Sequence, residues 1–247
     1  MMADAKRYYH TYEDRYASVY SHGAEYWTAD PEEIRDTAAK LQDFLDRWAL
    51  LPGQVRVVEF GCGEGHLARY LIERSYDYRG VDLSPSALVK ARQRVVDLQV
   101  KGDTFVLGDI TGLPVANDGA FDVVVDNFCL HMLVTDDDRR RYLATVRRVL
   151  RADGMAFFHE NHTARPMRGP VATFEEFVSR GGFTAGMSDE RTVYVDGAQR
   201  AIRLARVPFR AQDEVGYRQE LEEAGLAVRH FALDEAGHCV IHAKRSG

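Results

Sequence analysis

The sequence predicts an α/β fold, with a seven-stranded, mostly parallel sheet that ends in an antiparallel hairpin. Three observations predict it. Short buried runs alternate with helical segments over roughly residues 55–160, which is typical of a parallel sheet covered by helices on both faces. A glycine-rich turn follows the first of these runs. The last two runs flank Asp234-Glu235-Ala236-Gly237, a turn so short that it joins only antiparallel neighbours.

Composition narrows the class of protein. The chain has 247 residues, 45% hydrophobic and 28% charged, which suits one globular α/β domain with an insertion. Its formal net charge is −6, whereas proteins that bind a nucleic-acid backbone normally present a basic face, so a nucleic-acid substrate is disfavoured. There is no apolar run of membrane-spanning length, no apolar signal core, and three widely spaced cysteines fit a reducing compartment. We expect a soluble cytoplasmic monomer or homodimer.

Two helices are expected in the first fifty residues. Four tyrosines recur at every fourth position of residues 3–22, which places them along one helical face: Tyr8, Tyr12, Tyr16 and Tyr20. The second helix begins at Asp30-Pro31, where an N-capping aspartate precedes a first-turn proline and two acids. Its apolar positions keep helical spacing from Ile34 to Trp48, and Leu51-Pro52-Gly53 ends it.

Five buried runs then alternate with helices. The strands are expected at residues 55–60, up to Asp82, and at 104–107, 121–126 and 155–158. The helices between them are expected at residues 64–74, from the Ser84-Pro85 start onward, and at 137–150. Ligands of such sheets bind outside the carboxyl ends of the strands, so functional residues are expected there.

The last third of the chain departs from this rhythm. Residues 162–210 separate the fifth strand from a helix at 212–224, and they contain a hairpin whose turn is Asp196-Gly197. A connection this long in a compact domain is usually a lid or a substrate-binding addition. The strands at 226–231 and 238–243 then form the terminal hairpin.

The glycine turn and the acid that follows it suit a nucleotide-like ligand. Gly61, Gly63 and Gly65 lack Cβ atoms, so the backbone turns sharply and approaches a ligand closely. The spacing is G-x-G-x-G, with His66 where the dinucleotide fingerprint needs a glycine. Asp82 ends the second strand, where its carboxylate can accept hydrogen bonds from both hydroxyls of a ribose. Taken alone, the glycine turn fits several nucleotide ligands and also purely structural turns.

In order and spacing these motifs resemble those of the class I, Rossmann-like S-adenosylmethionine-dependent methyltransferases of small-molecule type. The resemblance covers roughly residues 40–160 and the terminal hairpin. It rests on four stretches: Val57 to Gly65, Gly80 to Ser84, Gly108-Asp109-Ile110, and Phe121 to Asn127 with Leu130-His131-Met132-Leu133. It implies S-adenosyl-L-methionine as the cofactor and S-adenosyl-L-homocysteine as the product.

We expect one domain over residues 1–247. Its parts would be an N-terminal helical lid at 1–50, a cofactor-binding core at 51–161, a substrate lid at 162–210, and the last helix and hairpin at 211–247.

The resemblance implies which residues hold the cofactor. Asp82 would bind the ribose and Asp109 the adenine amino group, with Leu83 and Ile110 against the ring. The methionine part would face Glu59, the backbone of Gly61, Cys62, Gly63 and Gly65, and, at its ammonium group, Asp126 and Asn127. As structural alternatives, Asp82 is a helix-start acid and Asp109 a turn residue. Cys62 is expected to be a small turn residue, because methyl transfer from a sulfonium needs no covalent enzyme intermediate.

Two polar groups are candidates for catalysis. His131 matches the leading histidine of a Leu-His-His-Leu sequence found in many small-molecule methyltransferases, with Met132 in place of the second histidine, and imidazole suits deprotonation of an acceptor near neutral pH. The alternative is a helix-start histidine bonded to backbone. His159 and Glu160 are further catalytic candidates and Asn161 and His162 substrate-binding ones, since four polar residues follow the fifth strand. Alternation sends Glu160 and His162 to one side and the other two to the opposite side.

A solvated loop is the structural alternative for residues 159–162. A metal site built from His131, His159, Glu160 and His162 ranks low, because ligands from separate loops cannot be assembled from sequence alone, and no metal is expected. The N-terminal region resembles the lid of thiopurine- and tellurite-type methyltransferases, which predicts aromatic pocket walls from Tyr16, Tyr20 and Trp27.

We therefore predict methyl transfer to a small polar acceptor. Aromatic walls together with Glu160 and Asp126 put an amine or guanidine-like nitrogen ahead of oxygen. The alternatives are an O-methyltransferase with a histidine base, a methyltransferase of a peptide terminus, a SAM-binding regulatory module without activity, and a nicotinamide-dependent reductase. The last is contradicted by the G-x-G-x-G spacing and the terminal hairpin.

Overall fold

The computed structural model describes residues 7–27, 30–112 and 119–247. Its seven-stranded sheet has the order β3-β2-β1-β4-β5-β9-β8. β1 to β5 are parallel, whereas β9 is antiparallel to both β5 and β8. The strands are β1 (Arg56–Phe60), β2 (Asp77–Asp82), β3 (Phe105–Leu107), β4 (Phe121–Asn127), β5 (Leu150–Glu160), β8 (Leu226–Leu233) and β9 (Cys239–Arg245). The predicted fold class is confirmed.

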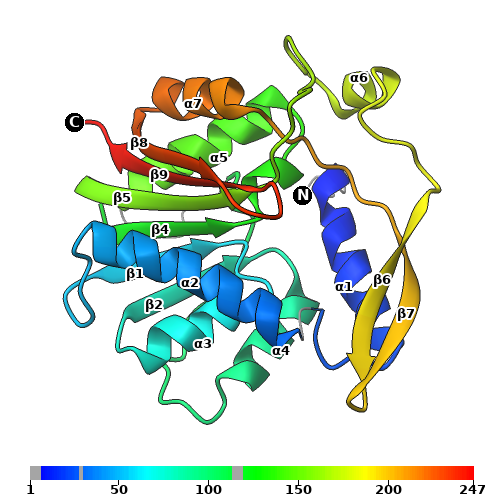
Figure 1. Ribbon diagram of the computed structural model, residues 1–247, viewed down its shortest axis with the longest axis horizontal. Helices are drawn as coiled ribbons and strands as arrows, with labels where there is room; N and C mark the ends of the chain where they lie inside the picture. Colours follow the sequence, from blue (N-terminus) through cyan, green and yellow to red (C-terminus); the bar gives the residue numbers. More distant parts are fainter. Residues whose placement is uncertain (1–6, 28–29, 113–118) are drawn as a thin grey trace, which may run out of the picture.

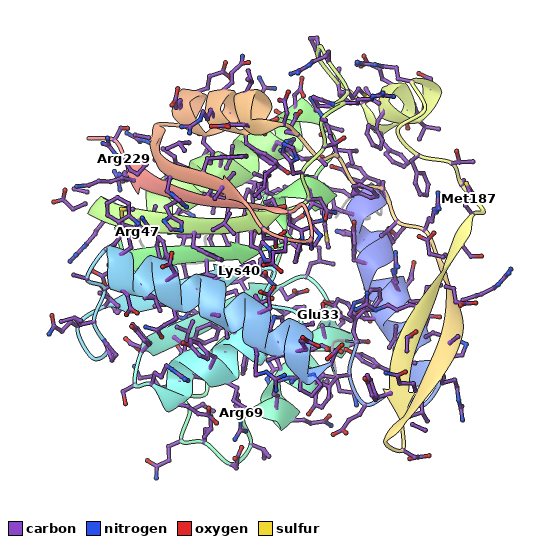
Figure 2. The ribbon with its side chains drawn as sticks, viewed as in Figure 1. Glu33, Lys40, Arg47, Arg69, Met187 and Arg229 are labelled. Atoms are coloured by element: carbon purple, nitrogen blue, oxygen red, sulfur yellow. The ribbon has the colours of Figure 1, made fainter. Side chains whose placement is uncertain are left out.

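Helices cover both faces of the sheet (Figure 1). One face packs on α2 (Pro31–Arg47), α3 (His66–Glu73) and α4 (Pro85–Arg94), and the other on α5 (Asp136–Val149) and α7 (Glu214–Glu223). Alternation along the strands divides the core: Val57 points to the first layer and Val58 to the second. Side chains fill the space between these layers (Figure 2).

Local signals explain where the helices begin. Asp30 and Ser84 cap α2 and α4, accepting hydrogen bonds from the backbone N–H groups of Glu32 and Ala87 at 2.9 Å. Both predicted starts are confirmed. α3 begins at His66 and not at residue 64, because Gly65 has a φ of +72° and terminates the turn in a left-handed conformation.

The predicted helix at residues 3–22 is shorter than expected. Residues 3–6 lie outside the described residues, a 3-10 turn spans Tyr8–His10, and α1 spans Thr11–Ser21. Tyr9 is buried at the 3-10 turn, and its hydroxyl bonds to Asp109 and Thr111. The strand expected at residues 155–158 is longer than predicted, since β5 runs over Leu150–Glu160.

The insertion carries the predicted hairpin, β6 (Ser188–Val195) and β7 (Ala198–Ala205), and a short helix, α6 (Phe174–Ser179). Asp196 and Gly197 have φ values of +52° and +77°, as a tight two-residue turn requires. The hairpin stands apart from the main sheet and lies beside α1 (Figure 1), where its buried side chains pack on Val19 and Ala24. Figure 2 shows Glu33 at the end of α2 nearest to this pair. No helix of the described ranges combines the length and apolar character needed to cross a membrane.

Candidate active site

A cavity of about 620 Å³ lies where β1, β2, β4 and β5 end. That volume is in the range of small-molecule sites. The sheet provides its floor, while its other walls come from α1, the start of α2, the chain around β6 and β7, and the turn between β8 and β9. Segments from both ends of the chain thus enclose one space at the expected edge of the sheet.

The glycine turn after β1 is packed against the lid helix. Gly61 and Gly63 have φ values of +70° and +49° and both line the cavity. A Cβ on Gly63 would stand 2.7 Å from the Tyr16 hydroxyl, and one on Gly61 2.7 Å from the Cys129 sulfur. The bare backbone is therefore required both for its conformation and for the close approach of α1 at Gly63 and of Cys129 at Gly61. Gly65 does not line the cavity and instead meets Ala91 of α4.

Asp82 is held at the end of β2 with its carboxylate toward the cavity. Its two oxygens accept hydrogen bonds at 2.8 Å from the backbone N–H groups of Gly63 and Ser84. Burial raises the pKa of Asp82 to about 6 despite these bonds. A fixed carboxylate with unused lone pairs in a cavity fits the two hydroxyls of a ribose.

Asp109 marks a second polar point of the cavity. One oxygen accepts from the Tyr9 hydroxyl at 2.7 Å, and the other from the backbone N–H of Thr111 at 2.8 Å. Burial opposes ionisation, but the hydrogen bonds from Thr111 and Tyr9 hold the pKa of Asp109 below its usual value. Leu83 and Ile110 line the same part of the cavity. The contribution of Tyr9 was not predicted.

Asp126, predicted to face the cofactor, lies beneath the cavity and does not line it. It is fully buried and accepts hydrogen bonds from the N–H groups of Cys129 and Leu130 at 2.8 and 3.1 Å and from the Tyr142 hydroxyl. Burial and the nearby Glu160 raise its pKa well above the usual value. Asp126 therefore shapes the loop after β4. Asn127, Glu59 and Cys62 do line the cavity, and burial raises the pKa of Glu59 to about 8.

Glu160 is also buried beneath the site, which corrects its expected place in the pocket. Its carboxylate accepts from the N–H groups of Leu130 and His131 at 3.0 and 3.1 Å and contacts Nδ1 of His131. His131 lines the cavity, and among the described residues its Nε2 has no hydrogen-bond partner. Burial lowers the pKa of His131 to about 3, so the imidazole is neutral at pH 7. With Nδ1–H directed to Glu160, Nε2 can accept a proton.

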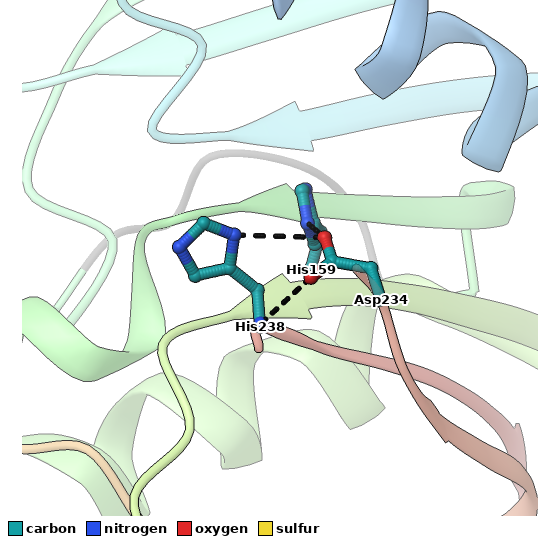
Figure 3. A group of neighbouring side chains, drawn as sticks. All are labelled: His159, Asp234 and His238. Carbon is teal, nitrogen blue, oxygen red and sulfur yellow. Dashed lines mark hydrogen bonds and ion pairs between the residues drawn. The ribbon is translucent and has the colours of Figure 1, made fainter. Parts of the chain in front are cut away.

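His159 has both ring nitrogens engaged. Nδ1 lies 3.0 Å from Oδ1 of Asn127, and Nε2 lies 3.1 Å from Oδ2 of Asp234 (Figure 3). His238 belongs to the same group. Its backbone N–H donates to Oδ1 of Asp234 at 2.8 Å, and its ring Nδ1 lies 3.5 Å from Oδ2 of Asp234. The sequence reading missed Asp234 and His238, which reach this edge because β9 pairs with β5.

The ligand atoms of His159, Asp234 and His238 all lie within 4.8 Å of one another. The metal site that was weighed from the sequence consisted of His131, His159, Glu160 and His162. Of these residues, only His159 belongs to the present group. Lys40 lies 3.4 Å from Asp234, and hydrogen bonds from His159 and the His238 N–H lower the pKa of Asp234 to about 2 although burial opposes it. The Asp234 carboxylate is thus ionised at neutral pH, paired with Lys40 and hydrogen-bonded to His159 and the backbone of His238.

Of the three aromatic residues predicted to form pocket walls, two line the cavity and one does not. Tyr16 and Trp27 line the cavity with ring centroids 5.6 Å apart. Tyr20 lies outside this lining, and its hydroxyl donates to Glu64 at 2.8 Å. Glu64, which was not singled out, also accepts from the N–H of Trp27 and so fastens the lid to the glycine turn.

Of the two residues expected to bind substrate after β5, only Asn161 lines the cavity. His162 pairs with Gln212 outside it, which corrects its expected role. Alternation separates residues 159–162 into two faces, and the face toward the cavity carries His159 and Asn161.

Comparison with known proteins supports the fold. Residues 57–154 match the family model described as a methyltransferase domain. A malonyl-acyl-carrier-protein O-methyltransferase from Pectobacterium atrosepticum is 31% identical over 44% of this chain and 41% of its own. A ubiquinone biosynthesis O-methyltransferase from Hahella chejuensis is 30% identical over 54% of this chain and 55% of its own. The chain spans about half the length of the curated relatives it matches.

Two solved structures cover nearly the whole chain. One is the 1,6-didemethyltoxoflavin-N1-methyltransferase of Burkholderia thailandensis with bound 1,6-didemethyltoxoflavin and S-adenosylhomocysteine. It has a TM-score of 0.62 and 21% identity, and the match covers 100% of this chain and 94% of its own. The other is the CcbJ methyltransferase of Streptomyces caelestis, with a TM-score of 0.64, 18% identity, and coverage of 96% and 98%. At these identities the likeness is one of fold.

Proposed function

We propose that this chain, which has the Rossmann-like fold of the class I S-adenosylmethionine-dependent methyltransferases, transfers a methyl group from that cofactor to a small molecule. One observation carries the proposal. A single cavity joins the glycine turn and Asp82 to a neutral histidine, His131, that is backed by a buried carboxylate. Bound there, S-adenosylmethionine would supply a methyl group already activated by its sulfonium.

The cavity residues fit the cofactor chemically. Asp82 offers acceptor oxygens for the ribose hydroxyls, and Asp109 lines the cavity together with Leu83 and Ile110, a polar group with two apolar ones that suits a flat base. Glu59 and the bare backbone of the glycine turn suit the amino-acid part. The chain's own contribution is then to orient both ligands and to exclude water under α1 and the hairpin.

The acceptor side favours an atom that loses a proton during methylation. Glu160 and Asp126, which had put amines and guanidines first, lie beneath the cavity, whereas four imidazoles line it: His66, His131, His159 and His238. Burial weakens His131 as a base, and the Glu160 carboxylate at Nδ1 offsets this by stabilising the imidazolium that forms when Nε2 takes the proton of the acceptor. We therefore favour a hydroxyl or ring N–H acceptor. Relatives named as an O-methyltransferase and an N1-methyltransferase agree with either atom.

Labelled donor and a broad small-molecule pool test the function. The purified chain is incubated with isotopically methyl-labelled S-adenosylmethionine and pools of phenols, hydroxylated acids and nitrogen heterocycles, and products are read by mass spectrometry. Calorimetry with S-adenosylhomocysteine and NAD runs in parallel. We expect one labelled product class and binding of S-adenosylhomocysteine only. Binding of NAD alone would support the reductase, and donor binding without transfer to any pool would support the regulatory module.

Donor affinity should depend on the ionisation of Asp82. Burial raises its pKa to about 6, and ribose hydroxyls donate to the ionised carboxylate, so binding selects the form present above that pH. Affinity for S-adenosylhomocysteine should be highest above pH 7 and fall about tenfold per pH unit below 6. Calorimetry from pH 5 to 8 measures this. The Asp82→Asn variant should bind weakly with no such slope, and an equal slope in that variant would assign the titration to another group.

A further inference from the structure

Two arginines that the mechanism does not use stand together on the cavity wall. Arg15 comes from α1 and Arg191 from β6, and both line the cavity. Their guanidinium carbons lie 4.8 and 4.5 Å from the centre of the Trp27 ring, within reach of cation–π attraction. Trp27 thus gathers two positive charges from segments far apart in the sequence.

These charges are incompletely satisfied by the protein. The Nε atoms of both arginines are buried and have no hydrogen-bond partner among the described residues. Burial lowers the pKa of Arg15, and Arg191 lowers it further; burial also lowers the pKa of Arg191. The ion pair of Arg191 with Glu33 is long, at 4.0 Å. Buried donors without partners are costly, and a bound anion would satisfy them.

The cluster adjoins the glycine turn. The backbone N–H of Trp27 donates to the carboxylate of Glu64, the residue after Gly63. The Tyr16 ring contacts the Trp27 ring, and its hydroxyl lies against Gly63. Glu33, Asp36 and Asp189 line the same cavity, and Glu33 is the ion-pair partner of Arg191. Positive and negative groups side by side suit a ligand that carries a carboxylate next to an ammonium group.

We propose that Arg15 and Arg191 form a carboxylate-binding subsite, and that its occupant is the amino-acid end of the methyl donor. This inference rests on the proposed function, since it assigns one end of the same cofactor. An acidic acceptor presents the same carboxylate chemistry, but the contacts of Trp27 and Tyr16 with the glycine turn favour the donor.

The assignment makes the insertion part of the donor site. Arg191 lies outside the segment that matches the methyltransferase domain, on a hairpin whose buried side chains pack on Val19 and Ala24. A bound donor would therefore tie the hairpin to the sheet through its carboxylate, and the acceptor would enter a cavity whose roof the donor has already fixed.

The test compares two ligands that differ in the amino-acid end. S-adenosylhomocysteine carries it and 5′-methylthioadenosine lacks it, and calorimetry measures both on the wild-type protein and on Arg15→Gln and Arg191→Gln. Each variant should bind S-adenosylhomocysteine at least roughly tenfold more weakly, because charge-assisted hydrogen bonds are lost, and methylthioadenosine unchanged. Arg203→Gln, on the exposed face of the same hairpin, is the control and should bind both like the wild type.

Each other outcome overturns the assignment. Equal weakening for both ligands would mean that the arginines only hold the fold together. Unchanged binding of both, with a raised KM for an acidic acceptor, would assign the subsite to the acceptor, and unchanged binding with unchanged KM would remove the subsite altogether. Failure of the wild-type protein to bind S-adenosylhomocysteine would instead contradict the proposed function, so the two failures are distinguishable.

Discussion

Replacing His131 by alanine should lower kcat by about 10²–10⁴-fold while leaving the affinity for S-adenosylhomocysteine nearly unchanged. His131 presents a neutral imidazole to the cavity with Nε2 unbonded among the described residues, and removing it takes away the proton acceptor. The donor contacts of Asp82 and Asp109 remain. Initial rates with the acceptor found by the pool screen, together with calorimetry, measure both quantities.

Two further variants sharpen this prediction. His162→Ala is the matched control, because His162 lies near in sequence to the site but outside the cavity, and its kcat should stay close to wild type. Glu160→Gln should lower kcat without weakening the donor, and the double variant with His131→Ala should be no slower than His131→Ala alone if Glu160 acts through His131. A full additional loss in the double variant would show that Glu160 has a separate role.

Replacing Arg139 by methionine should lower the free energy of unfolding by on the order of 3–5 kcal/mol. The Arg139 side chain is only 2% exposed and pairs with Glu220 at 2.6 Å. Its Nη1 donates to the carbonyls of Leu130 and Leu133, each at 2.9 Å. Methionine fills similar space but leaves those acceptors and a half-buried carboxylate unpaired.

Urea and thermal unfolding measure the effect of Arg139→Met. For a domain of this size the midpoint temperature should fall by roughly 10 °C. The neighbouring Arg140 offers a control: its side chain is 73% exposed and its ion pair with Asp137 is 3.5 Å long, so Arg140→Met should change stability by less than about 0.5 kcal/mol. Equal shifts in the two variants would contradict a structural role for the buried guanidinium.

Much of the fold could be predicted because its signals are local. The caps at Asp30 and Ser84 and the turn at Asp196-Gly197 each depend on a few adjacent residues, and all are present. The predicted ends of α1 and β5 were less accurate. Tyr9, in the 3-10 turn before α1, hydrogen-bonds to Asp109, which lies a hundred positions away in the sequence. No local pattern reveals such a contact.

In the site, the donor-binding residues were predicted better than the acceptor side, again because their signals are local. The residues expected to hold the donor follow one another in short motifs at strand ends, and most of them line the cavity. On the acceptor side, period-two alternation separated Glu160 from His159, but it could not tell which of the two sets faces inward. Asp234, His238 and Arg191 were missed because the pairing of β9 with β5 and the docking of the hairpin on α1 bring them in from distant segments.

The position of β9 has a consequence for the rate of folding. In the sheet, β9 lies between β5 and β8. The insertion, α7 and β8 separate Glu160 from Cys239 in the sequence, so they form one long loop that must close before these two residues pair. Closing such a loop costs chain entropy before any contact repays it, which makes this pairing slow. Because the same pairing fixes His159 and Glu160, catalytic competence should return in refolding with the last and slowest sheet contacts, later than the helical signal.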